Sequence, residues 1–158
     1  MKILKKIIIN ILFYPIFIIG LFIPKSKKIW IFGSWFGNSY TDNSRYLFEY
    51  ILNNKKDIIP IWLTNKKLVL KDLRNRNIRC YYKNSIKGFY YTARSYVIIV
   101  NQGIIDINKF GLSSQIKVLL WHGTPIKKIA FDDHINSHSY NENIYNFFFK
   151  NMEYFFSF

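Results

Sequence analysis

The chain has 158 residues, a length that corresponds to one domain. Half of the residues are hydrophobic and one fifth are aromatic, which excludes an intrinsically disordered or collagen-like chain. Lys and Arg total 23 against 9 Asp and Glu, and the resulting net charge of +14 favours an anionic partner. The single cysteine, Cys80, cannot form an internal disulfide, so nothing indicates an oxidising compartment.

The segment 1–28 differs from the rest of the chain. It contains six lysines and no acidic residue, so it supplies +6 of the net charge. Between its two basic clusters lies the apolar stretch 7–23, whose only clearly polar residue is Asn10 and which has Pro15 in its middle. A stretch of this length is at the short end of what a membrane-spanning helix needs. No small-x-small cleavage site follows it, which argues against a secretory signal.

This pattern predicts a hydrophobic N-terminal helix or helical hairpin that associates with an anionic membrane surface. Each basic residue near such a surface contributes about 1 kcal/mol. Two alternatives remain open: a helix buried in the protein's own core or against a further domain, and a true membrane span. Lysines on both sides of the apolar stretch set no clear orientation by the positive-inside rule.

Beyond residue 28, short apolar runs alternate with polar, helix-length segments, which is the pattern of right-handed βαβ units. The predicted fold class is therefore α/β, with a Rossmann-like, mostly parallel sheet over residues 29–158. Pro60 lies inside the second apolar run and predicts an edge strand or a bulge there. The expected strands are 29–33, 58–63, 78–82, 96–100 and 116–121, and the expected helices are 42–53 (capped by Asp42 or Asn43), 66–76, 85–94 and 141–150.

The last residues, 153–158, have the pattern of a sixth strand with no helix or polar tail after it. We therefore expect this chain to be the N-terminal part of a longer protein.

Two segments follow predicted strands at the edge of the sheet where open α/β folds form their sites. The first, 33–45, has Gly33 and Gly37 ahead of a helix start, and its backbone N–H groups are candidates for an anion cradle. It matches neither the dinucleotide-binding fingerprint nor the P-loop. The alternative is a turn whose glycines allow positive φ and whose Asp42 caps the helix.

The second segment, 120–128, brings His122 to the same edge. A histidine suits proton transfer near neutral pH, and the two lysines Lys127 and Lys128 would stabilise charge on a phosphoryl group. A general base beside cations is what an alcohol needs in order to attack a phosphate ester. The alternative is a histidine hydrogen-bonded to a backbone carbonyl at the end of a strand.

Two other polar clusters are not assigned to sites. Asp132, Asp133, His134 and His138 match no known metal-ligand spacing, so we predict no metal site. The basic stretch 66–79 has neither the aromatic sheet residues nor the recognition helix of a nucleic-acid-binding domain, so we predict no nucleic-acid partner.

Three pieces of the sequence resemble the CDP-glycerol glycerophosphotransferase family, whose members build poly(glycerol phosphate) teichoic acids. They are IWIFGSWFGNSYTDNSRYLFEYIL at 29–52, IIPIWLT at 58–64 and VLLWHGTPIKKIAFDD at 118–133. The third is the most specific, because Trp-His-Gly-Thr-Pro followed by a lysine pair is a hallmark of that family. The resemblance begins near residue 28 and runs to the end of the chain.

The resemblance implies the N-terminal half of a GT-B-like enzyme with two Rossmann-type domains, the second of which holds the CDP-glycerol donor. The implied reaction transfers glycerol phosphate from CDP-glycerol to a hydroxyl of a lipid-linked polyprenyl acceptor, without a further cofactor. The family's catalytic base falls on His122. Gly123, Thr124, Asn43 and Arg45 match positions expected to bind substrate.

We therefore expect 29–158 to be the acceptor-side domain of a transferase located at the cell membrane, peripheral or monotopic on its cytoplasmic face. The donor-binding domain is not part of this chain, so the chain alone is expected to be inactive. The alternative is a non-catalytic, truncated module that binds the membrane surface.

Overall fold

The computed structural model describes residues 15–16, 18–121 and 154–155. Its strands form one sheet in the order β3-β2-β1-β4-β5-β6, and every neighbouring pair is parallel. The chain builds outward from β1 to β3 and then crosses to the other side of β1, which is the strand order of a Rossmann fold. The strands are β1 (Ser26–Phe32), β2 (Ile59–Thr64), β3 (Cys80–Tyr82), β4 (Ser95–Val100), β5 (Ile116–Leu119) and β6 (Tyr154–Phe155).

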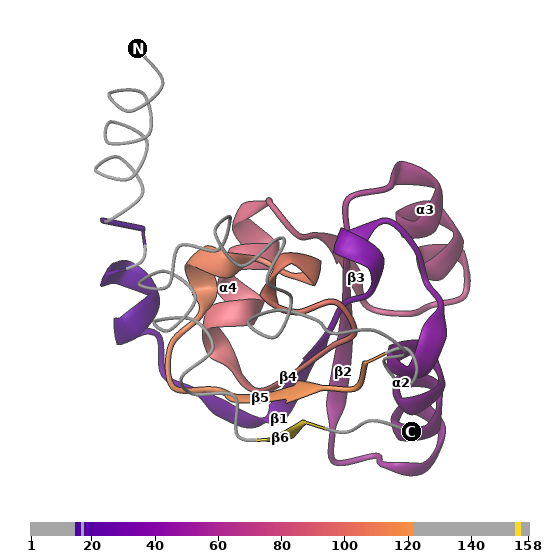
Figure 1. Ribbon diagram of the computed structural model, residues 1–158, viewed down its shortest axis with the longest axis horizontal. Coiled ribbons are helices and arrows are strands. Elements are labelled where there is room, and N and C mark those ends of the chain that lie inside the picture. Colours follow the sequence, from indigo (N-terminus) through magenta and orange to yellow (C-terminus); the bar gives the residue numbers. More distant parts are fainter. Residues whose placement is uncertain (1–14, 17, 122–153, 156–158) are drawn as a thin grey trace, which may run out of the picture.

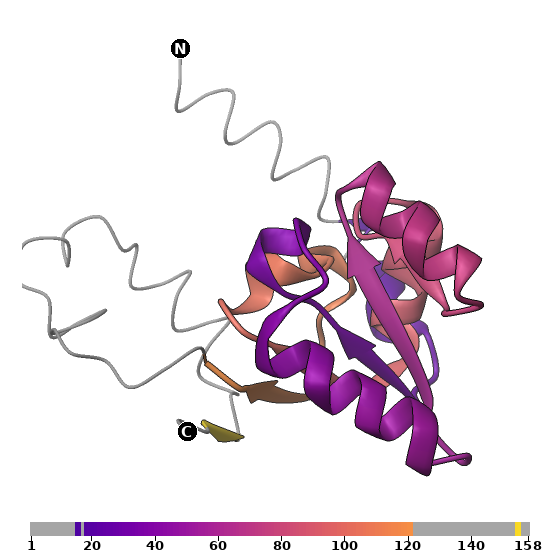
Figure 2. The same cartoon turned by 90° about the vertical axis from the view of Figure 1, so that its right-hand side faces the viewer.

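Helical segments cover both faces of this sheet. One face packs against α2 and α3, and the other packs against α4 and the segment that follows β4 (Figure 1). Figure 2 shows α2 lying across the sheet, with β1 and β2 running in the same direction behind it. The helices are α2 (Asp42–Asn54), α3 (Lys67–Asn75) and α4 (Ile86–Arg94), and the short 3-10 turns are η1 (Trp35–Gly37), η2 (Ile104–Asp106) and η3 (Lys109–Gly111).

The central strands are buried on both faces because successive side chains enter two different cores. In β1, the ring of Phe32 packs edge-on against Phe48 of α2 with centroids 5.1 Å apart, whereas Ile31 enters the core under α4. In β4, Ile99 joins the first core and Ile98 the second. This two-sided burial explains why the strand sequences are continuously apolar instead of alternating.

The predicted α/β class with a parallel sheet is confirmed. β1 begins at Ser26, three residues before the expected strand, and β5 ends at Leu119, two residues before the expected end. The predicted sixth strand is present as β6, which pairs with β5. The helix expected at 141–150 lies outside the described residues.

Pro60 does not mark an edge strand or a bulge, which corrects the sequence prediction. β2 lies between β3 and β1 in the sheet, and Pro60 is in register with Trp30 of β1. The N–H of Trp62 donates to the carbonyl of Arg79 at 3.0 Å. Because the backbone groups of alternate residues in a strand point to the same neighbour, the backbone nitrogen at position 60 also points towards the β3 side. Since β3 begins at Cys80, opposite Trp62, position 60 has no β3 residue beside it. A proline therefore fits inside β2 without removing a ladder hydrogen bond.

The N-terminal segment 1–28 is described only from Pro15, apart from Phe17. Among the described residues, no helix has the length and apolar character needed to cross a bilayer. Lys25, one of the six lysines, turns inward: its ammonium donates to the carbonyl of Ala93 at the end of α4 and to the hydroxyl of Ser113. Burial, together with the charge of Lys117, lowers the pKa of Lys25. This lysine is thus tied to the domain that follows it.

Candidate active site

The carboxyl ends of β1, β4 and β5 meet at one edge of the sheet. β1 and β4 are adjacent, and the chain leaves them towards opposite sides, which is the position where open α/β sheets bind ligands. Three segments come together here: 33–41 after β1, 101–106 after β4, and 120–121 after β5. Hydrogen bonds between side chains and backbone join all three.

The loop after β1 has an unusual backbone. Trp35, Phe36 and Gly37 have φ values of 47°, 61° and 82°, a left-handed conformation that is costly for two bulky residues in succession. Gly33 lies so close to the segment after β4 that a Cβ atom would be 2.7 Å from the carbonyl oxygen of Asp106. Backbone of this kind persists only where its surroundings hold it in place.

The buried carboxylate of Asp106 keeps the loop after β1 in this conformation. One oxygen of Asp106 accepts the backbone N–H of Phe36 (2.6 Å), and the other accepts those of Asn101 (2.9 Å) and Gln102 (2.8 Å). Burial raises the pKa of Asp106, and the three backbone hydrogen bonds and the nearby Lys83 ammonium oppose that rise. The ammonium of Lys83 also donates to the carbonyl oxygen of Phe36 at 2.9 Å. The loop after β1 is therefore fixed to the segment after β4.

The structure does not support an anion cradle at 33–45. The N–H groups of Gly33, Gly37 and Asn38 donate to backbone carbonyls at 2.9–3.1 Å, and that of Phe36 donates to Asp106. These four donors are used inside the protein and do not face a phosphate, so the anion cradle is wrong for this part of the segment. The alternative, a turn that leads into the helix, is confirmed only in part. Gly37 has a positive φ, but Gly33 does not. The N-cap of α2 is Thr41, so the expected cap at Asp42 or Asn43 is wrong.

Asn43 and Asn101 meet the end of β5 at one backbone carbonyl. The Nδ2 of Asn43 donates to the oxygen of Trp121 at 2.9 Å, and the Nδ2 of Asn101 donates to the same oxygen at 3.4 Å. The N–H and the hydroxyl of Ser44 both donate to Oδ1 of Asn101. Trp121 has a φ of 57° and is the residue before His122. The start of α2 and the ends of β4 and β5 thus form one polar network.

The predicted site residues differ in how far the structure places them. Asn43 lies at the edge of the sheet, in contact with the residue that precedes His122. His122, Gly123 and Thr124 lie outside the described residues, so their roles stay predictions.

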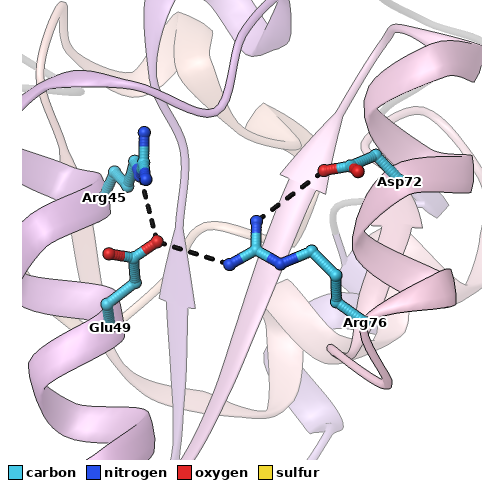
Figure 3. Close-up of polar contacts among 4 residues, drawn as sticks. All are labelled: Arg45, Glu49, Asp72 and Arg76. Atoms are coloured by element: carbon cyan, nitrogen blue, oxygen red, sulfur yellow. Dashed lines mark hydrogen bonds and ion pairs between the residues drawn. The ribbon is translucent and has the colours of Figure 1, made fainter.

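Arg45 takes part in an ion-pair network between α2 and α3 (Figure 3). Its Nε donates to Oε1 of Glu49 (3.0 Å), and the same oxygen lies 3.5 Å from a guanidinium nitrogen of Arg76. A second nitrogen of Arg76 lies 3.7 Å from Asp72. The ring of Tyr40 lies 5.4 and 5.5 Å from the two guanidinium carbons. These contacts hold the two helices together, while a contact of Arg45 with substrate stays a prediction.

The Glu49 carboxylate gives this network a testable pH dependence. Burial alone would raise its pKa, but the hydrogen bonds and charge of Arg45, with Tyr40 and Arg76, outweigh burial and lower the pKa below 4.5. Such a group stabilises the fold above its unfolded pKa and loses that contribution as the pH falls through its folded pKa. We expect Glu49→Gln to lower the melting temperature at pH 7 by more than it does at about pH 3.

Thermal unfolding, monitored by circular dichroism at both pH values, measures this change in melting temperature. The matched control is Asp57→Asn, an exposed carboxyl outside the network. Equal changes for Glu49→Gln at the two pH values would contradict the assigned role of the ion pairs.

Sequence reasoning missed Asn101 and Asp106, two fully buried polar residues that organise the site. The sequence does contain a feature from which these two residues could have been predicted. The motif Asn-Gln-Gly-Ile-Ile-Asp directly follows an apolar strand that ends at Val100, so its polar residues lie at the carboxyl edge of the sheet.

These features define a Rossmann-type α/β domain whose loops after β1, β4 and β5 converge on one edge. The chain belongs to the family described as CDP-glycerol:poly(glycerophosphate) glycerophosphotransferase, whose model matches residues 15–157. This confirms the family resemblance noted in the sequence.

Curated relatives agree with this membership. The teichoic acid poly(glycerol phosphate) polymerase of Bacillus spizizenii is 34% identical over 119 residues, which cover 73% of this chain and 29% of that protein. The teichoic acid glycerol-phosphate transferase of Staphylococcus aureus is 32% identical over 108 residues, which cover 68% of this chain and 27% of that protein. The chain thus spans less than a third of the length of these relatives.

A solved structure of the wall teichoic acid polymerase TagF, a histidine variant soaked with CDPG, has the same fold as this chain. It matches with a TM-score of 0.61 and 20% sequence identity, and covers 83% of this chain and 33% of the TagF chain.

Proposed function

We propose that this chain forms the acceptor-side part of an enzyme that transfers glycerol phosphate from CDP-glycerol to a hydroxyl of a lipid-linked acceptor. The product would be a teichoic acid or a related surface polymer. The observation that carries the proposal is the family match over residues 15–157, nearly the whole chain. The relatives named above, a polymerase and a transferase of glycerol phosphate in teichoic acid, support the same reaction class.

In this mechanism His122 is the general base. It removes the proton of the acceptor hydroxyl, and the oxygen attacks the phosphorus that carries glycerol. The new oxygen–phosphorus bond forms as the bond to the CMP leaving group breaks, so the products are a phosphodiester and CMP. Positioning and charge stabilisation supply most of the rate in such phosphoryl transfers. Gly123, Thr124, Asn43 and Arg45 are the candidates for binding substrate, and no further cofactor is required.

The donor would be held by a second Rossmann-type domain, in a GT-B-like arrangement. This part of the proposal is supported by the length of the relatives, of which the chain spans 29% or less. The 158-residue chain by itself would then release no CMP from CDP-glycerol.

The test is an assay of the protein encoded by the intact reading frame, with CDP-glycerol and a lipid-linked glycerol phosphate acceptor. CMP release coupled to growth of the acceptor supports the proposal. If the protein binds anionic vesicles but shows no transfer, the alternative of a non-catalytic membrane-surface module takes its place. Turnover by the isolated 158-residue chain would overturn the two-domain arrangement.

Attachment to the cytoplasmic face of the membrane is a separate proposal, and it rests on the segment 1–28, of which residues 1–14 can be deleted without removing any described contact. These contain three of the lysines, Lys2, Lys5 and Lys6, followed by the first part of the apolar stretch. At about 1 kcal/mol for each lysine, deleting 1–14 is expected to weaken binding to anionic vesicles by roughly 100-fold or more. The deletion leaves β1 and the contacts of Lys25 in place.

Vesicle sedimentation with anionic and zwitterionic lipid measures the effect. The control is a variant in which Lys55 and Lys56, both exposed after α2, are replaced by Gln. Equal binding by the intact and the truncated chain would remove the membrane proposal.

A further inference from the structure

We propose that Asn43 and Asn101 are positioning residues, whose side-chain amides hold the carbonyl of Trp121 and so fix the point from which the chain leads into His122. The inference rests on the proposed function, in which His122 is the general base.

The geometry at this carbonyl is specific. Two amide nitrogens from different elements donate to one oxygen, at 2.9 Å from Asn43 at the start of α2 and at 3.4 Å from Asn101 after β4. This oxygen belongs to the peptide bond that joins Trp121 to His122. Because a peptide group is planar, holding its oxygen restricts the orientation of the whole group.

The backbone of Trp121 is strained and needs hydrogen bonds of this kind to keep its conformation. Its φ of 57° lies in the left-handed region, which is unfavourable for a residue with a large side chain. Contacts that over-determine a strained conformation are a feature of sites where a reactive group must be held in one geometry. A general base must be held in one geometry, because a displacement of the base by about 1 Å can reduce the reaction rate by about 100-fold.

The orientation of the Asn101 amide is also determined. Asn101 is fully buried, and its Oδ1 accepts both the N–H and the hydroxyl of Ser44, so its Nδ2 is the group left to face Trp121. Its backbone N–H in turn donates to Asp106. A series of hydrogen bonds, from Asp106 to Asn101 and from Asn101 to Trp121, therefore connects the loop after β1 with the residue before His122.

This role differs from substrate binding by Asn43, which the family resemblance implies. A residue that binds the acceptor acts mainly on KM, whereas a residue that positions the base acts on kcat. The two roles therefore predict different kinetics for the same variant.

The first experiment measures steady-state kinetics of Asn43→Asp in the protein from the intact reading frame. The substitution keeps the size of the side chain, removes the N–H donor, and places a carboxylate oxygen against the carbonyl. We expect kcat to fall by about 10–100-fold, with KM for CDP-glycerol and for the acceptor within about twofold. A rise in acceptor KM at unchanged kcat, or unchanged kinetics in folded protein, would overturn the proposal.

Asn54→Asp is the matched control. Asn54 lies at the other end of α2, where its Nδ2 donates to the carbonyl of Tyr50 at 2.8 Å. The control thus removes the same type of hydrogen bond from the same helix, far from the edge of the sheet, and should keep full activity. Asn43→Ala removes the donor without adding charge, and serves as the second variant if Asn43→Asp unfolds.

The second experiment does not depend on activity. The chain has only three histidines, so the imidazole carbon signals of the labelled 158-residue chain can be assigned by NMR with a His122→Gln variant. Asn43→Ala, which removes the donor without adding charge, is expected to move the His122 signal, and Asn54→Ala to leave it unchanged. An unmoved His122 signal in folded Asn43→Ala would overturn the positioning role.

The two experiments separate the failure of the inference from the failure of the proposed function. If the unmodified enzyme transfers no glycerol phosphate but the His122 signal still responds to Asn43→Ala, only the proposed function fails. If transfer is normal and neither kcat nor the NMR signal responds, only the inference fails.

Discussion

His122→Ala is expected to lower kcat by about 10²–10⁴-fold, the usual contribution of a general base, in the protein from the intact reading frame. KM for CDP-glycerol should hardly change, because the donor would be held by the second domain. The melting temperature should stay close to that of the unmodified protein, since a histidine placed after the end of a strand contributes little packing. Steady-state kinetics measured beside thermal unfolding test all three expectations.

His134→Ala and His138→Ala are the controls, because these are the other two histidines of the chain and neither is assigned to the site. Both should retain full turnover. A folded His122→Ala variant with near-normal kcat would remove His122 from the mechanism. Loss of activity only in proportion to loss of folded protein would instead indicate a histidine that serves the fold alone.

Asp106→Ala is expected to cause the largest loss of stability among the described residues of the site. It leaves three backbone N–H groups, those of Phe36, Asn101 and Gln102, without their carboxylate acceptor. A buried donor left without a partner costs about 1–3 kcal/mol. The N–H of Asn101 is buried and the other two are partly buried, so we expect a loss of about 3 kcal/mol in total. At this chain length we expect the melting temperature to fall by about 10 °C.

Chemical denaturation and thermal unfolding of the 158-residue chain measure this loss directly. Asp57→Ala, at an exposed acidic position, is the control and should change stability by less than about 0.5 kcal/mol. Asp106→Asn retains one acceptor oxygen and should fall between the two. Equal stabilities of the Asp106→Ala and Asp57→Ala variants would show that the Asp106 carboxylate does not hold the loop after β1.

Much of the fold was predictable because it depends on local pattern. The run Tyr-Val-Ile-Ile-Val before Asn101 forms β4 because side chains on both faces of a central parallel strand are buried. The helix expected at 42–53 is likewise present as α2. The face expected to be buried, with Tyr46, Leu47, Tyr50 and Ile51, is only partly right, because Phe48 and Ile51 are buried whereas Tyr46 and Tyr50 are exposed. Pro60 misled the prediction because its effect depends on where β3 begins, and that position is set by strands far apart in sequence.

The site was predictable only in part. Residue type and position after a strand placed His122 and Asn43 at the carboxyl edge of the sheet, and the structure places Asn43 there, in contact with Trp121. The same reasoning could not decide between an anion cradle and a turn at 33–45, because it had no means of showing that a carboxylate 70 residues after Phe36 accepts one of the N–H groups. The partnership of Arg45 with Arg76 through Glu49 was equally out of reach, since it depends on how α2 and the residue after α3 are placed on the same face of the sheet.

By itself, the sequence determined the α/β class, the order of strands and helices along the chain, and the membership of the family, because each follows from local periodicity or from motif residues. Only the tertiary structure decided which partners the polar groups at the edge of the sheet bind within the protein. Asp106, Asn101 and Asn43 are strongly polar residues at the same edge, yet their hydrogen bonds go to the protein's own backbone. A buried polar group must find a partner, and which partner lies within about 3 Å is fixed by the packing of segments that are distant in sequence.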